Sequence, residues 1–228
     1  MTRPQASDYD HKKQLILDKA AELFGVHGFE TTTMHDVALA CGASKSHVYH
    51  YFGRKEDLLF AIVSEHIRSL AAELAAIADL PLAADQRFAR MVQAFVECAS
   101  ASRNQHLVLM HDLKFLPAEQ RAEVSALQSQ LLDMMVAVLR ELNGALLSGS
   151  ETSRPYALMV YGTMIWTFTW YRPDGPIKPA ELAARMAEVF LDGLRAAQGP
   201  VINARAAEPA NESGSAGCRP GSVRRPGP

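Results

Sequence analysis

Large apolar residues recur along this chain at the spacing of an α-helix. Between residues 127 and 142 they mark one face of four successive turns: Leu127, Leu131, Met134, Met135, Val138 and Leu142. The same spacing is found over 16–24 and 182–194, and it is typical of amphipathic helices. Sustained alternation with a period of two, which would indicate half-buried strands, does not occur. The pattern therefore predicts an all-α protein.

Glycine, proline and capping residues divide this pattern into about nine helices. Gly28 is expected just past the first helix, because glycine adopts the left-handed conformation there without a steric penalty. Thr33 and Asp36 are spaced to cap the second helix reciprocally. The expected helices span 10–27, 33–42, 44–52, 55–78, 83–102, 104–114, 117–143, 151–171 and 179–197.

The last thirty residues differ in composition from the rest. The segment 199–228 holds five prolines, five glycines and few large apolar side chains, so it is expected to be a disordered tail. Its Arg219, Arg224 and Arg225 are expected to be solvated, with contact to phosphates as the alternative. The whole chain is 48% hydrophobic, and the part before the tail is long enough for one large domain or two small ones.

Three features of the sequence argue against a disulfide-rich or zinc-binding protein, a secreted protein and a membrane-spanning protein. Three widely spaced cysteines without a Cys-x-x-Cys pair argue against a disulfide framework or a zinc site, and they fit a reducing compartment. The polar segment 1–11 lacks the apolar region of a secretory signal. The uncharged stretch 155–171 is shorter than the ~20 residues of a membrane span. We expect a cytoplasmic protein with no membrane association.

An enzyme is the weakest interpretation, because no catalytic set of residues is visible. His106 and His111 do not have the i, i+4 spacing of a helical metal pair, and no glutamate of a metalloprotease motif lies between them. Cys98 has no basic neighbour in sequence to activate it. Turnover of CoA thioesters by the purified protein would overturn this expectation.

The segment from Thr33 to Lys55 predicts a helix-turn-helix that binds double-stranded DNA. Its two short helices are joined by residues 41–43, and Ala38, Gly42 and Val48 stand where the helices approach, reverse and pack. The second helix presents short polar and cationic groups that suit phosphates and base edges in a major groove. These are Ser44, Lys45, Ser46, His47 and His50.

Positive charge is focused on the second half of this segment, where no acid accompanies it. Residues 43–55 contain three cations and no acid, whereas 1–66 contain seven Lys or Arg against nine Asp or Glu. The net charge of the chain is −2, so bulk charge does not attract nucleic acid and the contact edge must be narrow. Lys55 stands at a helix start, where backbone N–H groups also favour a phosphate.

The same segment resembles the DNA-binding domain of the TetR/AcrR family of transcriptional regulators over about 12–66. The resemblance is carried by TTMHDVA at 32–38, CGASK at 41–45, YHYF at 49–52 and KEDLL at 55–59. It implies phosphate contacts by Thr33 and Lys55. It places Ser44, Lys45, Ser46 and His47 in the groove, and Tyr49, His50 and Tyr51 at phosphate-contacting and packing positions.

Two positions depart from the pattern of many family members, which have glycine in place of Ser46 and threonine in place of His47. The operator sequence and the base contacts therefore stay open. Tyr51 and Phe52 are expected to be core residues rather than DNA contacts, and Val37 and Val48 are expected to be scaffold.

The family resemblance implies a division into a DNA-binding domain over 10–54 and an effector-binding and dimerisation domain over 55–198. The dimer would form through the helices 151–171 and 179–197 and would bind a palindromic operator. Candidate effector contacts are apolar, aromatic or basic residues at helical spacing, for which ordinary core packing is the alternative. They are Met91, Phe95, Arg103, His106, Met110, Met134, Met135, Tyr161 and Trp166.

The run WTFTWYRPDG at 166–175 resembles family members that sense acyl-CoA or aryl-CoA thioesters of fatty-acid, sterol or phenylacetate catabolism. This implies a small-molecule effector rather than a cofactor, with its phosphates near Arg103 or Arg172. The competing interpretation is that Trp166 and Trp170, one helical turn apart, stack on a dimer partner. The expected function is that of a repressor released by its effector, and an activator is the alternative.

Overall fold

The computed structural model describes residues 3–172 and 174–197, without the side chains of 3–7 and 168. The predicted tail 199–228, with Cys218, lies outside these residues. Within them the all-α prediction is confirmed, since nine α-helices, one 3₁₀ helix and no strand are present. The elements are α1 (Arg3–His27), α2 (Met34–Ala40), α3 (Lys45–Tyr51), α4 (Lys55–Ala78), α5 (Ala84–Ala101), α6 (Arg103–His111), η1 (Leu113–Phe115), α7 (Ala118–Leu142), α8 (Ser150–Trp170) and α9 (Pro179–Ala196).

Two helices differ from the expected boundaries. α1 begins at Arg3 rather than near residue 10. Its first turns are polar, so apolar periodicity could not reveal them, and Pro4 suits a first helical turn. The expected helix 104–114 is divided into α6 and η1. The N–H of Asp112 closes α6 on the carbonyl of Val108, and the N–H of Phe115 then bonds the carbonyl of Asp112 in the tighter i, i+3 pattern.

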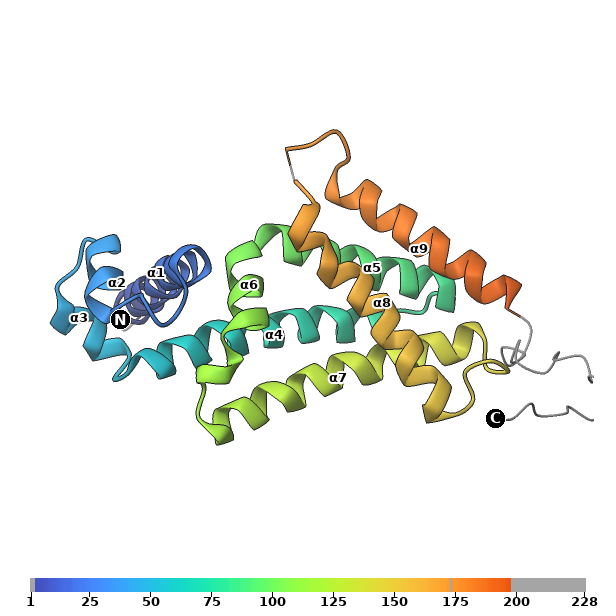
Figure 1. Cartoon of the computed structure of the whole chain (residues 1–228), viewed down its shortest axis with the longest axis horizontal. Coiled ribbons are helices and arrows are strands. Elements are labelled where there is room, and N and C mark those ends of the chain that lie inside the picture. Colours follow the sequence, from blue (N-terminus) through green and yellow to red (C-terminus); the bar gives the residue numbers. More distant parts are fainter. Residues whose placement is uncertain (1–2, 173, 198–228) are drawn as a thin grey trace, which may run out of the picture. The chain divides into compact units, whose positions relative to one another are not determined.

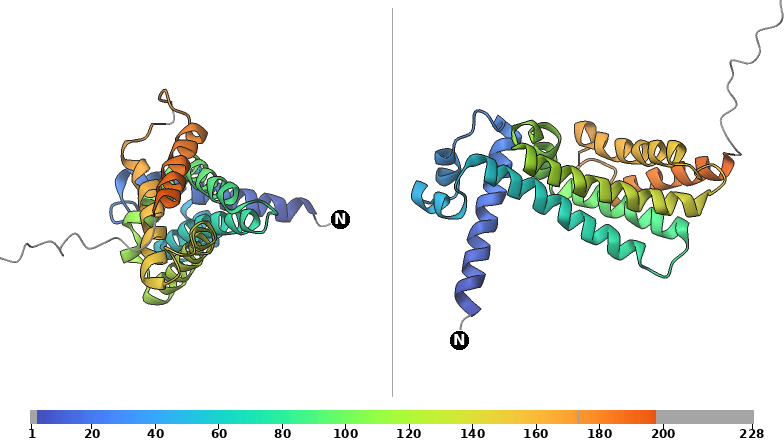
Figure 2. Two further views of the ribbon diagram at one scale, coloured as in Figure 1. Left: turned by 90° about the vertical axis from the view of Figure 1, so that its right-hand side faces the viewer. Right: turned by 90° about the horizontal axis from the view of Figure 1, so that it is seen from below.

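The long helix α4 follows the helix-turn-helix and extends into the helices of the second half of the chain. Figure 1 shows α2 and α3 close to its start, and α5, α7 and α8 around its second half. α1 packs on α4 and on α6, α4 packs on α5, α6 and α7, and α9 packs on α5. The views in Figure 2 show α1 running across the start of α4 rather than along it. None of the described helices is long and apolar enough to cross a membrane.

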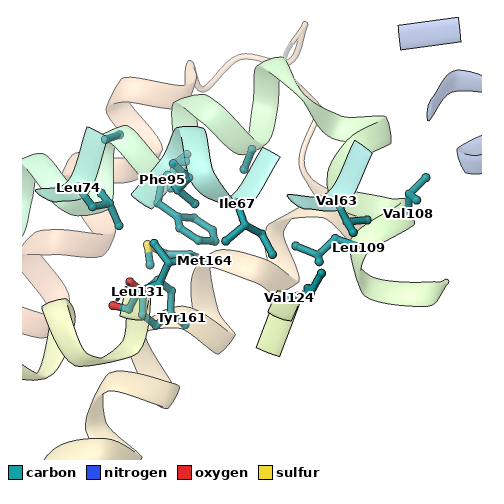
Figure 3. Close-up of a cluster of buried hydrophobic side chains, with 14 of the residues drawn as sticks. Val63, Ile67, Leu74, Phe95, Val108, Leu109, Val124, Leu131, Tyr161 and Met164 are labelled. Carbon is teal, nitrogen blue, oxygen red and sulfur yellow. Dashed lines mark hydrogen bonds between the residues drawn. The ribbon is translucent and has the colours of Figure 1, made fainter. Parts of the chain in front are cut away.

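The core follows the apolar faces that the sequence indicates. Val37, Ala38 and Val48 are at most 1% exposed, as expected for the scaffold of the helix-turn-helix. In the second half, Ile67 and Leu74 of α4 meet side chains from α5 to α8, several of which are labelled in Figure 3. One continuous set of buried side chains therefore extends from the helix-turn-helix along α4.

Candidate nucleic-acid interface and effector cavity

The turn between α2 and α3 has the geometry that the helix-turn-helix prediction requires. Gly42 has φ +61°, a left-handed conformation that other residues adopt only with strain. The N–H of Ala43 donates to the carbonyl of Ala38 at 2.9 Å. Thr33 caps α2 in the predicted box with Asp36, and the hydrogen bonds from Thr33 lower the pKa of the Asp36 carboxyl. The two helices are thus held at a fixed crossing by local bonds.

Helix α3 presents most of the predicted DNA contacts to solvent. Ser44, Lys45, Ser46, Tyr49 and His50 are exposed, and His47 is half-buried. The Ser44 hydroxyl also caps the helix by accepting from the N–H of His47 at 3.2 Å. These side chains form one edge, which we call the α3 edge.

An aromatic cluster behind the α3 edge orients its histidines. The rings of His47 and His50 meet Tyr51 edge to face, with centroids 5.2 and 5.5 Å apart. On its other side Tyr51 contacts Tyr9 of α1, with centroids 4.7 Å apart. Sequence reasoning missed Tyr9, because both the family resemblance and the expected first helix begin after it.

Ion pairs neutralise several cations near the α3 edge, so fewer unpaired positive charges lie there than the sequence count indicates. On α1, Lys12 pairs with Asp8 and Lys19 with Glu22, while Arg54 pairs with Asp57 at 3.0 Å. Lys45 makes no ion pair with another described residue, and its ammonium lies 5.7 Å from the centre of the Tyr49 ring. Lys45 is therefore the cation of the α3 edge that is best placed for a phosphate.

Lys55 has an environment that its predicted phosphate role does not explain. Its ammonium donates to the carbonyls of Phe29 and Thr32 at 2.6 and 2.8 Å, with a longer contact of 3.3 Å to that of Glu30. It also lies 4.2 Å from the centre of the Phe29 ring. In this arrangement Lys55 holds the loop 28–33 against the start of α4, and the phosphate contact stays a prediction.

A cavity of about 420 Å³ lies among the helices of the second half. This volume is within the usual range of small-molecule sites. Five helices supply its mostly apolar lining. The lining residues are His66, Ile67 and Leu70 of α4, Phe95 of α5, His106, Leu109 and Met110 of α6, Ser125, Gln128, Ser129, Leu131 and Leu132 of α7, and Leu158, Tyr161 and Ile165 of α8.

The cavity contains four of the predicted effector contacts, Phe95, His106, Met110 and Tyr161. The other five are not among its described lining residues. Met91 and Met135 are fully buried core, and Met134 is half-buried against the same core. Trp166 is 66% exposed on the outside of α8. Arg103 lines a separate depression together with Arg172.

Sequence reasoning also missed several lining residues. His66, Ile67 and Leu70 follow a clear helical spacing on α4, but an apolar face alone does not say whether it meets a neighbour or a cavity. Ser125, Gln128 and Ser129 are exposed polar residues and give no apolar signal. A histidine on an otherwise apolar helix face, as at His66, is the one sequence feature that could have indicated a cavity.

The two cavity histidines are buried and uncharged at neutral pH. Burial lowers the pKa of His66 to about 4, because the charged imidazolium loses its hydration. Burial lowers the pKa of His106 to about 3, and His66 beside it contributes a smaller repulsion. The centroids of the two rings are 5.8 Å apart.

These histidines should make folding stability depend on pH below neutrality. The unfolded chain takes up protons near the ordinary pKa of about 6.5, whereas the folded chain does so only near the lowered values. The histidine contribution is therefore complete above pH 6.5 and is lost as the pH falls toward the folded pKa values. We expect the free energy of unfolding to fall by roughly 2 kcal/mol per histidine between pH 6.5 and 4.5.

Urea unfolding at several pH values measures this effect. The variants His66→Leu and His106→Leu should each lose part of the pH dependence. His111→Leu, at an exposed position of α6, is the matched control. It should keep the pH dependence, because both buried histidines are still present. If the free energy of unfolding varied with pH in both buried variants as it does in the wild type, the expectation would be contradicted.

Two family descriptions match this chain. Residues 16–62 match "Bacterial regulatory proteins, tetR family", and residues 81–194 match "Tetracyclin repressor-like, C-terminal domain". The chain is 26% identical over 200 residues to the HTH-type transcriptional repressor KstR2 of Rhodococcus jostii, covering 85% of this chain and 98% of that protein. Sequence relatives are therefore found for both halves of the described fold.

Solved structures agree with this relationship. A TetR-family transcriptional regulator from Bordetella parapertussis is 31% identical, with a TM-score of 0.76 over 82% of this chain and 98% of its own. The structure of AibR, in complex with isovaleryl coenzyme A and operator DNA, is 23% identical, with a TM-score of 0.69 over 78% and 97%. At 23% identity, the similarity to AibR supports the fold only.

The sequence matches and the fold lead to one conclusion about identity. The turn at Gly42, the capped α3 and the long α4 have the arrangement of a DNA-binding helix-turn-helix joined to a helical domain. The matched regions cover both parts. The chain belongs to the TetR family of bacterial regulatory proteins, and it is a DNA-binding transcriptional regulator rather than an enzyme.

Proposed function

We propose that this chain is a homodimeric repressor that leaves its operator when a small molecule fills the cavity among α4 to α8. The observation that carries the proposal is the cavity wall, since α4 and α6 line it and the same two helices pack on α1. The relative from Rhodococcus is described as a repressor, and AibR was solved with both a coenzyme A thioester and operator DNA. Such a regulator acts in the cytoplasm, where the bacterial chromosome lies.

The proposed DNA contacts belong to the α3 edge and its flanks. Ser46 and His47 are placed to discriminate bases, and Ser44, Lys45, Tyr49 and His50 to hold the backbone or the groove. Thr33 flanks this edge as a further phosphate contact, and Lys55 flanks it either as a phosphate contact or as the residue that holds the loop 28–33. We place the division between the DNA-binding domain (10–54) and the effector domain (55–198) at the start of α4.

Dimerisation is supported by the outer face of α8. Leu158, Met159, Trp166 and Trp170 of α8 are each more than half exposed, and Val189 of α9 is 72% exposed. Exposed apolar patches of this kind are typical of protein interfaces. A two-fold dimer through α8 and α9 would form a four-helix bundle and would set two α3 edges about 34–36 Å apart on a palindrome.

The effector class we favour is an acyl-CoA or aryl-CoA thioester. The apolar cavity suits the acyl or aryl group. A separate depression would hold the phosphates at its two arginines; it is lined by Arg103, Thr169, Trp170, Tyr171, Arg172 and Asp174. Arg103 lies one turn from the cavity residue His106, and Thr169 lies one turn from the cavity residue Ile165. The two regions are therefore adjacent along both α6 and α8.

The signal would reach the DNA-binding helices through α6 as well as α4. η1 follows α6, and the ring of its Phe115 stacks on Phe29, with centroids 5.0 Å apart. Phe29 in turn lies under the ammonium of Lys55. A ligand that binds one arrangement of α6 better than the other would shift this contact and the loop 28–33.

Footprinting tests the proposed function directly. The purified protein should protect a palindromic site upstream of its own gene or of neighbouring genes. An effector should abolish the protection at the protein concentration that half-saturates the site. The absence of any protected palindrome in these regions would contradict the proposal.

Lys45 and Lys55 should respond differently to substitution. Lys45→Ala should weaken binding to all sequences and reduce the slope of log affinity against log salt by about one, because one phosphate contact is lost. If Lys55 mainly holds the loop 28–33, Lys55→Ala should lower the melting temperature and the affinity but leave the slope unchanged. A slope reduced by about one in Lys55→Ala would establish its phosphate contact instead. Ser46→Ala or His47→Ala should alter the preferred sequence.

Acyl- and aryl-CoA thioesters should raise the melting temperature, because they bind the native state only. At a hundredfold excess over the dissociation constant the stabilisation is about 2.7 kcal/mol. Arg103→Ala or Arg172→Ala should weaken the thioester without changing the response to the free acid, and Arg90→Ala on the surface of α5 is the matched control. A flat response to every thioester, with a shift by another compound class, would exclude this effector class.

Phe115→Ala should separate binding from regulation. The variant should bind operator and effector, but the effector should lower operator affinity at least about fivefold less than in the wild type, since typical coupling factors are 5–150. Glu119→Ala, exposed in the first turn of α7, is the control and should retain full regulation. Full regulation in Phe115→Ala would rule out the route through η1.

A further inference from the structure

Tyr51, the last residue of α3, supports both imidazoles of the α3 edge. The rings of His47 and His50 each meet the Tyr51 ring edge to face, with centroids 5.2 and 5.5 Å away. In the proposed DNA contact, His47 discriminates bases and His50 holds the backbone or the groove. The position of the Tyr51 ring therefore sets where both imidazoles can reach DNA.

Helix α3 is too short to fix this ring by itself. It has seven residues, of which Val48 is the buried one. A helix of this length is not stable in isolation, so its order comes from tertiary packing. Phe52, just after the helix, is 6% exposed, but the Tyr51 ring is only half-buried. The orientation of Tyr51 therefore depends on a neighbour outside α3.

Tyr9 of α1 is this neighbour. Its ring centroid lies 4.7 Å from that of Tyr51, and the two ring planes are inclined by 30°. Aromatic pairs at such distances attract each other beyond the effect of the area that they bury. Tyr9 is itself 45% exposed, so it contributes less to the core than a buried aromatic residue would. Its contact thus serves the rings of α3 more than the stability of the domain.

Tyr9 lies in turns of α1 that precede the helix-turn-helix region. The segment that matches the family begins at residue 16, whereas α1 begins at Arg3. The first turns of α1 are polar, and Tyr9 is the aromatic residue that they bring to α3. The contact is therefore a feature of this chain's own N-terminal turns rather than of the matched segment.

A ring that is held in the free protein binds DNA at a lower entropic cost. Fixing a mobile side chain at an interface opposes binding, and a side chain that is already fixed avoids this cost. The effect concerns the imidazoles that touch bases and groove, and it does not concern the attraction of Lys45 to any phosphate. Release of the Tyr51 ring should therefore weaken the preferred sequence more than other sequences.

We propose that Tyr9 is a positioning residue for sequence recognition. Its ring holds Tyr51, and Tyr51 holds His47 and His50 in the orientation in which they contact DNA. The inference rests on the proposed DNA contacts of the α3 edge. It extends the recognition machinery to a part of α1 that makes no base contact itself.

Two DNA duplexes test this inference with the full chain. One is the sequence that the wild type selects from a pool of randomised duplexes, and the other is a scrambled duplex of equal length and composition. Tyr9→Ala should reduce the ratio of the two affinities at least about fivefold, through weaker binding of the selected duplex. Affinity for the scrambled duplex should stay within about twofold of the wild type. The melting temperature should change by less than about 4 °C, since the position is on the surface.

Three further variants identify the group responsible. Tyr9→Phe should keep the wild-type ratio, because the ring rather than the hydroxyl makes the contact. Tyr9→Leu keeps an apolar side chain without a ring and should lower the ratio as Tyr9→Ala does, so it decides the question if Tyr9→Ala does not fold. Leu15→Ala, at a 40% exposed position of the same helix, is the matched control and should keep the ratio.

The outcomes separate this inference from the proposed DNA contacts. An unchanged ratio in Tyr9→Ala and Tyr9→Leu overturns the inference and leaves those contacts in place. Equal weakening of both duplexes would show a structural role only, and an equal loss in Tyr9→Phe would assign the effect to the hydroxyl; either result also overturns it. Selection that enriches no sequence contradicts base reading by the α3 edge and overturns both.

Discussion

Burial of one apolar face along the whole of α4 is the constraint on which this structure depends. Leu58 and Leu59 are fully buried at the end that meets the DNA-binding helices, and Ile67 and Leu74 are buried at the end that meets the effector cavity and its core. Each such side chain contributes about 1.5–3 kcal/mol when it is buried. Neither end of the helix can separate from its neighbours without a large loss of stability. In the proposed regulation, a change of packing around the cavity would move α4, and with it the start of the DNA-binding domain.

The loop 28–33 adds a second connection between the two ends. Lys55 holds it by hydrogen bonds to backbone carbonyls, and Phe29 from the same loop stacks on Phe115 after α6. An ammonium that loses water needs such oxygen partners, so the contact has a stabilising role of its own. Because the same side chains join α4, the loop and η1, this contact stabilises the domain, and in the proposed regulation α6 would act on the loop through it.

DNA recognition in this protein depends on a small surface. Ion pairs within α1 and at the start of α4 neutralise most nearby cations, and Lys45 remains on the α3 edge. In the DNA contact proposed for the α3 edge, long-range attraction would therefore be weak, and specificity would come from short hydroxyls and imidazoles held in place by capping bonds and by Tyr51. This arrangement favours discrimination between sequences over tight non-specific binding.

The sequence by itself determined the local structure and the family. Apolar periodicity predicted the all-α class, and glycine, proline and capping residues predicted most helix boundaries. The spacing of Ala38, Gly42 and Val48 predicted the helix-turn-helix. These features depend on residues close together in the chain. Only the tertiary structure decided which apolar faces meet a cavity. Met91, Met134 and Trp166 are large apolar residues of the same helices or their neighbours, as Phe95 and Tyr161 are. Only Phe95 and Tyr161 line the cavity, whereas the other three lie in the core or at the surface. Likewise, the sequence placed Lys55 near DNA, and the fold brought three carbonyls of a distant loop to its ammonium. Periodicity specifies the side of a helix that is buried, whereas the packing of several helices specifies what that side contacts.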